Sequence, residues 1–578
     1  LYMNKIFTIV VILFLSFTSI YAETVTSEPL EIWSEDQSSD SNLNDITSTP
    51  DSAEKKEDPL PIISQADIDY SAYDTIGFYD QTNNGFSPTM WENSEFEDVE
   101  FLMSQLAVEY RSLTVDNLLN KTLLTISTPP KKNLNTDKIF LDLKLEYYLK
   151  TQNDLIVKQI LDQISQDDWS DSDLTNYLNH FLISDNHKLI CQEKYINKFK
   201  DKKTKLLYQI FCKTISNNLP AADLLLSLLQ EQGKVDEEFL YLINTYINGQ
   251  EIELNKIKYL NLLKLSLIKN KNTDFSNLIN DESNLSLKKY FALSNMKTTE
   301  KKIKIIEELV QKNLINSDVL AKNYKTYITE NNISNTSNYN NTKNELEKRI
   351  FLFSEIRNTS DQKYLSDLAV EYVNVMRENN LLNHTYELIY DKIKVIKPTS
   401  DLQTQAFNIC ILLILNNDND KCNEWSQIIK FNNNHKLEYS LIKYYLHLKS
   451  EIVSDQFNQL VLSNIISSEK IADFNKNLIT KHIEISSQIK LPNYWKSKSE
   501  LKKVSTIVPN IKTIEYLKSL SNTSVGEKSL LILILNGGNE MNALDYFSIF
   551  SILESLYLID SNALKNLIFE LNIKTIIL

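Results

Sequence analysis

The stretch KLLYQIFCKTISNNLPAADLLLSLLQEQG, residues 205–233, decides the fold class. Its apolar side chains recur every three or four residues over 205–215 and again over 221–232, and a short polar turn separates the two runs. This period is typical of an amphipathic helix with one face toward a core. Two such runs joined by a short turn predict a pair of antiparallel helices, that is, a helical hairpin.

The same pattern continues from residue 94 to the C-terminus and predicts, for example, a helix over 189–199. No run alternates convincingly as a strand would. We therefore expect an all-α fold, an irregular α-solenoid of stacked helical hairpins. No tetratricopeptide or ankyrin signature aligns with any pair of helices. The expected parts are an N-terminal helical-hairpin array over 94–330, an Asn-rich loop over 331–344 and a C-terminal helical-hairpin array over 345–578.

The N-terminus has the features of a secretory signal peptide. Lys5 precedes an apolar run from Ile6 to Tyr21, which ends at Ala22. We expect a signal peptide over 1–22 with cleavage after Ala22. The alternative is an uncleaved anchor, but the run is shorter than the roughly 20 residues that a spanning helix needs. The sequence thus predicts a periplasmic protein without a stable membrane span after cleavage.

Acidic residues are concentrated near the N-terminus. The net charge is −15, and only Lys55 and Lys56 are basic between Glu23 and Tyr110. Residues 23–66 are rich in Ser, Thr, Asp, Glu and Pro, so we expect a disordered acidic linker there. An acidic, exported chain is not expected to bind nucleic acid.

An aromatic segment follows this linker. Aromatic side chains are dense over 67–93 without a helical period. Because a solvated linker would not carry so much apolar area, we expect an extended segment that docks on the helical body. Phe78, Phe86 and Trp91 are the predicted docking residues.

Signatures of catalysis and ligand binding are missing from the sequence. The six histidines are scattered, without the spacing of metal ligands, and no complete phosphate-binding loop or Ser, His and Asp set is present. The low glycine content, seven residues in 578, disfavours folds with many tight turns. The sequence therefore predicts no catalytic residue, no cofactor and no metal.

The four cysteines are predicted to form two local disulfides. Cys191 and Cys212 lie on either side of a Lys-rich turn, so that in a hairpin they reach the same height. Cys410 and Cys422 flank a polar hairpin tip in the same way. An oxidising compartment favours both bonds. The alternative is four buried free thiols.

Some local patterns resemble a family of uncharacterised exported helical bacterial proteins, sometimes labelled antifreeze glycopeptide polyprotein. The resemblance implies an all-helical exported protein and supplies no catalytic residues. No flat Thr or Ala repeat suited to ice is present, so antifreeze activity is not expected. The similar pieces are Ile76-Gly77-Phe78, Asn84-Gly85-Phe86, Met90-Trp91, Leu123-Leu124-Thr125 before Pro129-Pro130, Cys191, Ile210-Phe211-Cys212, Ala222-Asp223-Leu224-Leu225, the run from Leu228 to Gly233, and 553–570.

These observations favour a non-catalytic exported helical scaffold that binds another envelope protein. Two alternatives stay open: a cell-wall-active enzyme with an unrecognised cleft, and a carrier of a small or lipidic ligand. Two facing carboxylates within about 9 Å would favour the enzyme. A closed apolar cavity of several hundred Å³ would favour the carrier.

Overall fold

The structure is a computed structural model that describes residues 73–132, 138–331, 344–449, 459–486 and 507–576. Within these ranges the regular structure is helical, and pairing of extended backbone is confined to isolated bridges such as that of Tyr79 with Thr125. The predicted all-α class is confirmed. The signal peptide over 1–22 and the acidic linker over 23–66 lie outside the described residues, as do residues 332–343 of the Asn-rich loop.

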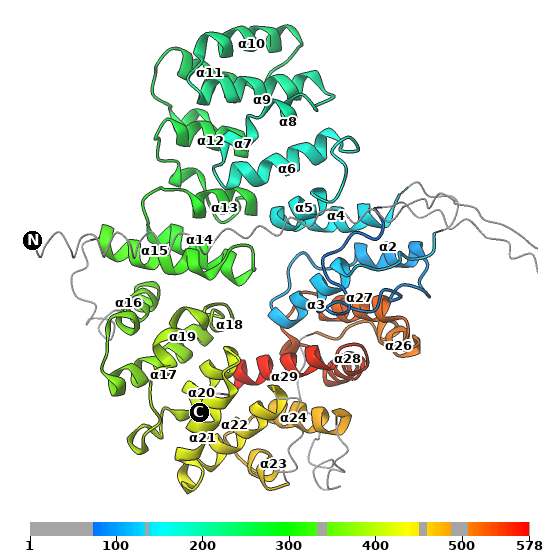
Figure 1. Cartoon of the computed structure of the whole chain (residues 1–578), viewed down its shortest axis with the longest axis vertical. Helices are drawn as coiled ribbons and strands as arrows, with labels where there is room; N and C mark the ends of the chain where they lie inside the picture. The colour runs from blue at the N-terminus through cyan, green and yellow to red at the C-terminus, as the bar shows by residue number, and fades with distance from the viewer. Residues whose placement is uncertain (1–72, 133–137, 332–343, 450–458, 487–506, 577–578) are drawn as a thin grey trace, which may run out of the picture. The chain divides into compact units, whose positions relative to one another are not determined.

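The helices follow one another along the chain with short connections (Figure 1). The first group comprises α2 (Phe96–Ser104), α3 (Leu113–Leu124), α4 (Phe140–Lys150), α5 (Asp154–Leu161), α6 (Asp171–Ile183), α7 (His187–Ile190), α8 (Glu193–Ile196), α9 (Lys202–Ile215), α10 (Leu219–Glu231), α11 (Glu237–Ile247), α12 (Leu262–Asn270), α13 (Leu285–Leu293), α14 (Glu300–Gln311) and α15 (Ser317–Glu330).

The second group comprises α16 (Glu345–Asn358), α17 (Gln362–Glu378), α18 (Leu382–Thr385), α19 (Glu387–Ile393), α20 (Ala406–Leu415), α21 (Asn419–Ile429), α22 (Lys436–Lys449), α23 (Gln459–Ile466), α24 (Asp473–Ser486), α26 (Ile511–Ser519), α27 (Val525–Asn536), α28 (Tyr546–Ile559) and α29 (Ser561–Thr575). Single 3₁₀ turns lie at Leu254–Lys256, Ser276–Leu278, Ser400–Leu402, Asn433–His435 and Met541–Ala543.

Consecutive helices pack in pairs, as in α5 with α6, α9 with α10, α16 with α17 and α20 with α21. The predicted helices over 205–215 and 221–232 correspond to α9 and α10. The predicted continuous helix over 189–199 is instead two single turns, α7 and α8. Gln192 between them is extended, with φ −72° and ψ 129°, and this interrupts the helix.

Asparagine performs at several helix ends the role that glycine usually has. Asn217, Asn272, Asn313 and Asn380 follow α9, α12, α14 and α17, and their φ values lie between 54° and 59°. A left-handed residue after a helix closes its last turn, and among residues with a side chain asparagine tolerates this conformation best. The chain can therefore end many helices although it has only seven glycines.

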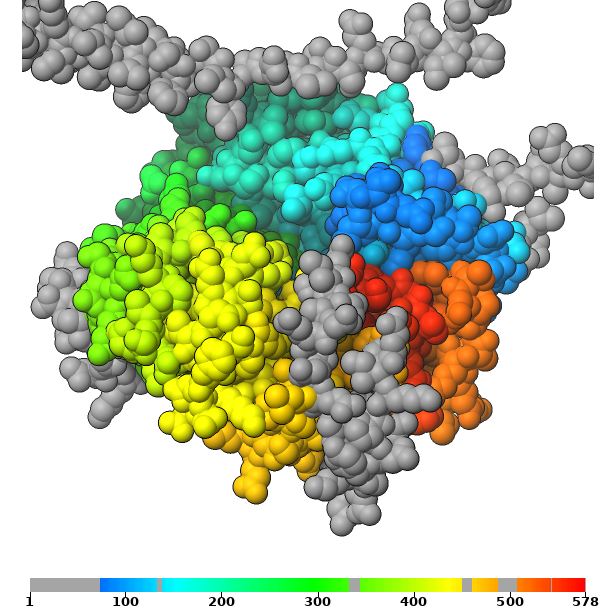
Figure 2. All heavy atoms as spheres, turned by 60° about the horizontal axis from the view of Figure 1, so that its bottom comes forward, coloured from blue at the N-terminus to red at the C-terminus, as the bar shows by residue number. Residues whose placement is uncertain are grey.

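The two ends of the described chain pack together. Helices α27 and α29 pack against α3, and α27 also packs against α2. Figure 1 shows the red C-terminal helices beside the blue N-terminal ones, and in Figure 2 these colours share one continuous surface. In a solenoid each repeat contacts only its neighbours, so these contacts differ from the predicted arrangement. The described parts of the two predicted arrays belong to one compact unit.

The predicted docking segment is described from residue 73 and contains no helix before α2. Phe86 and Trp91 are buried, whereas Phe78 is half-buried against the core. The Gly526 N–H donates to the Met90 carbonyl at 3.1 Å. A Cβ on Gly526 would lie 2.3 Å from the Trp91 ring, so the absence of a side chain there lets Trp91 pack directly on α27.

Candidate functional site

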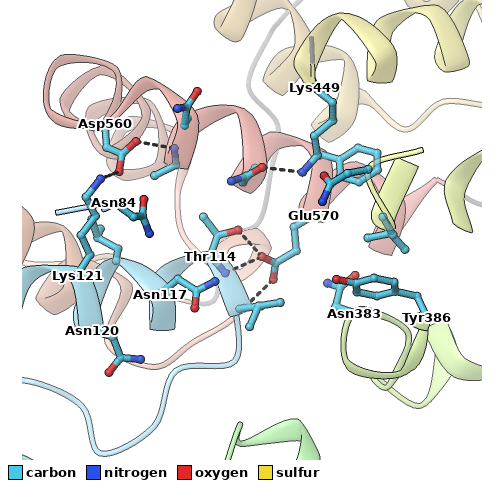
Figure 3. A pocket seen from close by; sticks show the side chains of 18 of the residues that line it. Asn84, Thr114, Asn117, Asn120, Lys121, Asn383, Tyr386, Lys449, Asp560 and Glu570 are labelled. Atoms are coloured by element: carbon cyan, nitrogen blue, oxygen red, sulfur yellow. Dashed lines mark hydrogen bonds and ion pairs between the residues drawn. The ribbon is translucent and has the colours of Figure 1, made fainter. Parts of the chain in front are cut away.

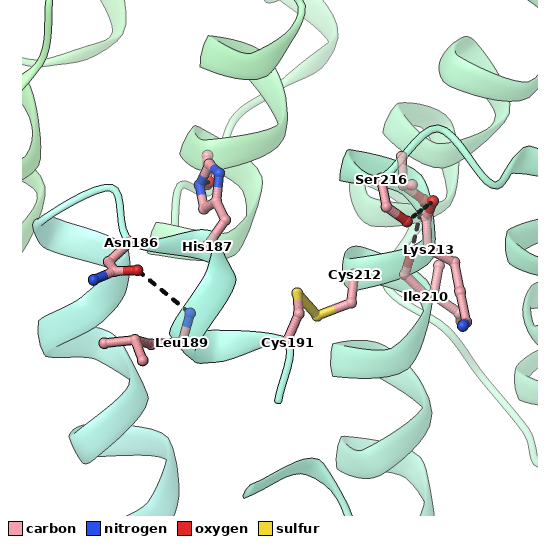
Figure 4. Close-up of a disulfide and its surroundings, with 10 residues drawn as sticks. Asn186, His187, Leu189, Cys191, Ile210, Cys212, Lys213 and Ser216 are labelled. Atoms are coloured by element: carbon pink, nitrogen blue, oxygen red, sulfur yellow. Dashed lines mark hydrogen bonds between the residues drawn. A yellow bond between two sulfur atoms is a disulfide. The ribbon is translucent and has the colours of Figure 1, made fainter. Parts of the chain in front are cut away.

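The first predicted cysteine pair forms a disulfide. Cys191 directly follows α7, and Cys212 lies in the last turn of α9. Their Cα atoms are 5.5 Å apart, which suits a disulfide. Figure 4 shows the bond joining α7 to α9 across the hairpin. The pairing of Cys191 with Cys212 is thus confirmed.

The second predicted pair is not a disulfide in this structure. Cys410 on α20 and Cys422 on α21 are free and fully buried. The Cys410 thiol donates a hydrogen bond to the Cys422 carbonyl oxygen at 3.1 Å. The hairpin tip brings the two residues together as predicted, but the Cys410 sulfur is engaged with backbone rather than bonded to the Cys422 sulfur.

A pocket of about 500 Å³ lies among helices that are far apart in the sequence (Figure 3). Its lining comes from the loop before α2 and from α3, α18, the ends of α20 and α22, and α29. It contains two carboxylates, Asp560 and Glu570, and two lysines, Lys121 and Lys449. The pocket forms where the two ends of the described chain pack together, so no local sequence motif predicts it.

Glu570 caps the N-terminus of α3. Its carboxylate accepts hydrogen bonds from the Leu113 and Thr114 N–H groups and from the Ser112 and Thr114 hydroxyls, at 2.8–3.2 Å. Burial raises the pKa of Glu570, and the hydrogen bonds from Thr114 and Ser112 oppose this. All these donors belong to the start of one helix, where a negative charge is favoured. Through these hydrogen bonds Glu570 attaches α29 to the start of α3.

Asp560 has a similar structural role at the start of α29. It accepts from the Ala563 N–H at 2.9 Å as the N-cap and forms a 2.7 Å ion pair with Lys121 of α3. Glu570 lies ten residues further along the same helix, about 15 Å at 1.5 Å per residue. Catalytic carboxylate pairs in glycoside hydrolases are roughly 5–9.5 Å apart. The backbone separation of this pair exceeds that range, and each carboxylate has its own set of donors.

The remaining polar groups of this pocket are mostly side-chain amides. Asn84, Asn117, Asn383, Asn417 and Asn562 line it from five different elements. Sequence reasoning missed them because asparagine is common throughout the chain and these residues have no shared spacing. Only their convergence in space distinguishes them.

A second pocket, of about 400 Å³, contains a perturbed carboxyl group. Asp116 of α3 accepts a hydrogen bond from the Asn313 Nδ2 at 3.1 Å. Burial raises the pKa of Asp116 to about 6. A general acid or base needs a pKa near neutrality. Asp116 is therefore the residue to substitute when the enzymatic alternative is tested.

Across the described ranges, the His, Cys, Asp and Glu side chains form no group suited to a metal ion. No helix in this part of the chain is both long and apolar enough to cross a membrane. Compared with known proteins, the chain matches no protein-family model, no curated protein and no solved structure.

Proposed function

We propose that the chain is an exported, non-catalytic helical scaffold that binds another protein of the cell envelope. The proposal rests on the hydrogen bonding and separation of the two carboxylates in the 500 Å³ pocket. Glu570 and Asp560 cap α3 and α29 and lie about 15 Å apart along one helix. Both carboxylates are engaged in hydrogen bonds at helix ends. This supports a binding role for the pocket rather than acid–base chemistry.

Two features support the location. The apolar run from Ile6 to Tyr21 before Ala22 resembles a secretory signal. The disulfide between Cys191 and Cys212 is the kind of bond that persists in oxidising compartments such as the periplasm. Together they favour export over a cytosolic location.

An exposed apolar strip on α10 is the candidate contact for a protein partner. Leu224 and Leu228 are 65% and 42% exposed and lie one turn apart, so they share a face of the helix. The opposite face carries Leu226 and Leu229 into the core. The core contacts of α10 are thus made by its other face, and the two exposed leucines favour an interaction surface.

The test is crosslinking of the exported protein in its native envelope, followed by identification of the captured partner. We expect Leu224→Asp/Leu228→Asp to reduce capture of that partner at least tenfold, because two charges would replace the apolar contact. Leu155→Asp on α5 is the matched control, since Leu155 is also an exposed leucine, at 51%. Equal capture by all three proteins, or no reproducible partner, would contradict the proposal.

The lipid-carrier and enzyme alternatives rest on different features of the two pockets. A lipid carrier needs an apolar cavity, whereas the 500 Å³ pocket is lined largely by amide and charged side chains. The enzymatic alternative depends on Asp116. If the chain cleaved envelope glycans and Asp116→Asn abolished the cleavage, the non-catalytic proposal would be wrong.

A further inference from the structure

The pocket between α3 and α29 is enriched in asparagine beyond the composition of the chain. Asparagine provides seven of the 19 lining residues, against 63 of the 578 residues overall. The difference is more than threefold, so a general abundance of asparagine does not account for the lining. The pocket concentrates side-chain amides.

Most of these amides are available to a ligand. Among the described residues, the side chains of Asn84, Asn117, Asn383, Asn417 and Asn562 have no hydrogen-bond partner, and only Asn383 is half-buried rather than exposed. Each amide offers two N–H donors and one acceptor oxygen. Figure 3 shows Asn84 and Asn117 on one side of the pocket and Asn383 on the other. A bound molecule would therefore meet donors and acceptors from several directions.

The charges of the pocket compensate one another. Lys121 pairs with Asp560 at 2.7 Å. Lys449 donates to Asn566 Oδ1 at 2.7 Å and lies 5.0 Å from the Phe569 ring centroid. With Glu570, the lining holds two lysines and two carboxylates. A phosphorylated or strongly acidic ligand would find no excess positive charge, so the lining favours a neutral one.

Two half-buried aromatic side chains, Tyr79 and Tyr386, also line the pocket. Burial raises the pKa of Tyr386 to about 12, so its hydroxyl keeps its proton at neutral pH. Aromatic ring faces carry partial negative charge and attract C–H groups that carry partial positive charge. The volume of about 500 Å³ lies within the roughly 300–1,000 Å³ range of small-molecule sites.

From these features we propose that the pocket binds a neutral saccharide, a role beyond the protein binding proposed above. A sugar ring carries hydroxyl groups around its rim, which match amides on several sides, and C–H faces, which match the tyrosine rings. An extended peptide presents its backbone donors and acceptors mainly along two edges. Amides that come from five elements around the pocket fit the rim of a sugar better than the two edges of a peptide.

The test is titration calorimetry of the full chain with maltohexaose, cellohexaose and N-acetylchitohexaose as separate probes. We expect at least one probe to bind, and Asn117→Leu and Asn562→Leu each to weaken its binding at least tenfold. Leucine nearly matches asparagine in shape but offers no hydrogen bond. Asn244→Leu on α11 is the matched control, since Asn244 is exposed and lies outside this pocket. It is expected to bind like the wild type.

Thermal unfolding checks that each variant folds, and Asn383→Leu replaces any variant that does not. If no probe binds at millimolar concentration, or if binding is the same in the pocket variants and in Asn244→Leu, the proposal is overturned. A random-sequence heptapeptide pool is titrated in parallel. Peptide binding that requires Asn117 and Asn562, without saccharide binding, would assign the pocket to peptides and also overturn the proposal. None of these results depends on the α10 surface.

Discussion

Two hairpins, one from α7 to α9 and one from α20 to α21, each bring two cysteines together, but only the first pair is bonded. Cys191 is half-buried just after α7, next to the surface of its hairpin. Cys410 lies in α20, whose residues from Ala406 to Ile414 are all buried. The two pairs are 21 and 12 residues apart in sequence, and their surroundings differ. Proximity therefore brings cysteines into reach, and the local packing determines whether they bond.

The first hairpin is expected to show the largest effect when its cysteines are removed. The disulfide closes a loop of 21 residues, which corresponds to about 3 kcal/mol in the chain-entropy model. Cys191→Ala/Cys212→Ala should lower the free energy of unfolding by about that amount, measured by urea denaturation. Dithiothreitol should produce the same loss in the wild type and none in the double variant. A wild type insensitive to dithiothreitol would refute the disulfide.

A smaller loss is expected in the second hairpin. Cys410→Ala removes a buried sulfur and its hydrogen bond to the Cys422 carbonyl, which should cost about 1–2 kcal/mol in urea denaturation. Cys410→Ser should cost less where its hydroxyl keeps that hydrogen bond. If dithiothreitol destabilised Cys191→Ala/Cys212→Ala, the pair at Cys410 and Cys422 would be oxidised, and the contrast between the two hairpins would be wrong.

The smallest expected effect is a difference in pH dependence. Burial raises the pKa of Cys410 well above its ordinary value of 9.0. Above that pH the unfolded chain releases the thiol proton while the folded chain retains it, so stability falls as pH rises. Between pH 9 and 10 we expect the wild type to lose about 1 kcal/mol more than Cys410→Ala.

A cystine does not titrate, so Cys191→Ala/Cys212→Ala should keep the wild-type pH dependence. The free energy of unfolding measured at pH 8.5, 9, 9.5 and 10 separates these cases. Parallel curves for wild type and Cys410→Ala would show that the buried thiol ionises as readily as in the unfolded chain.

Much of the local structure could be predicted. The apolar period over 205–215 and 221–232 predicted α9 and α10 closely, because an amphipathic helix is encoded by neighbouring residues. The helix predicted over 189–199 failed at Gln192, where the backbone is extended. The apolar period continues past that residue, so the period alone could not reveal the break.

The candidate site could not be predicted in the same way. Glu570 and Thr114 are joined by hydrogen bonds across 456 residues of sequence. Neither side chain belongs to a motif, and the seven asparagines of the pocket have no common spacing. Such a site arises when α29 packs on α3, and this contact depends on the whole arrangement between them.

The all-helical class, the hairpin of α9 and α10 and the pairing of Cys191 with Cys212 could all be predicted from local sequence. These features follow from helical period and from short separations along the chain. Three features emerge only in the folded chain: the two ends of the described chain meet, Cys410 is a free thiol and the amides converge on one pocket. Those outcomes depend on side-chain packing between residues far apart in sequence, which no local pattern encodes.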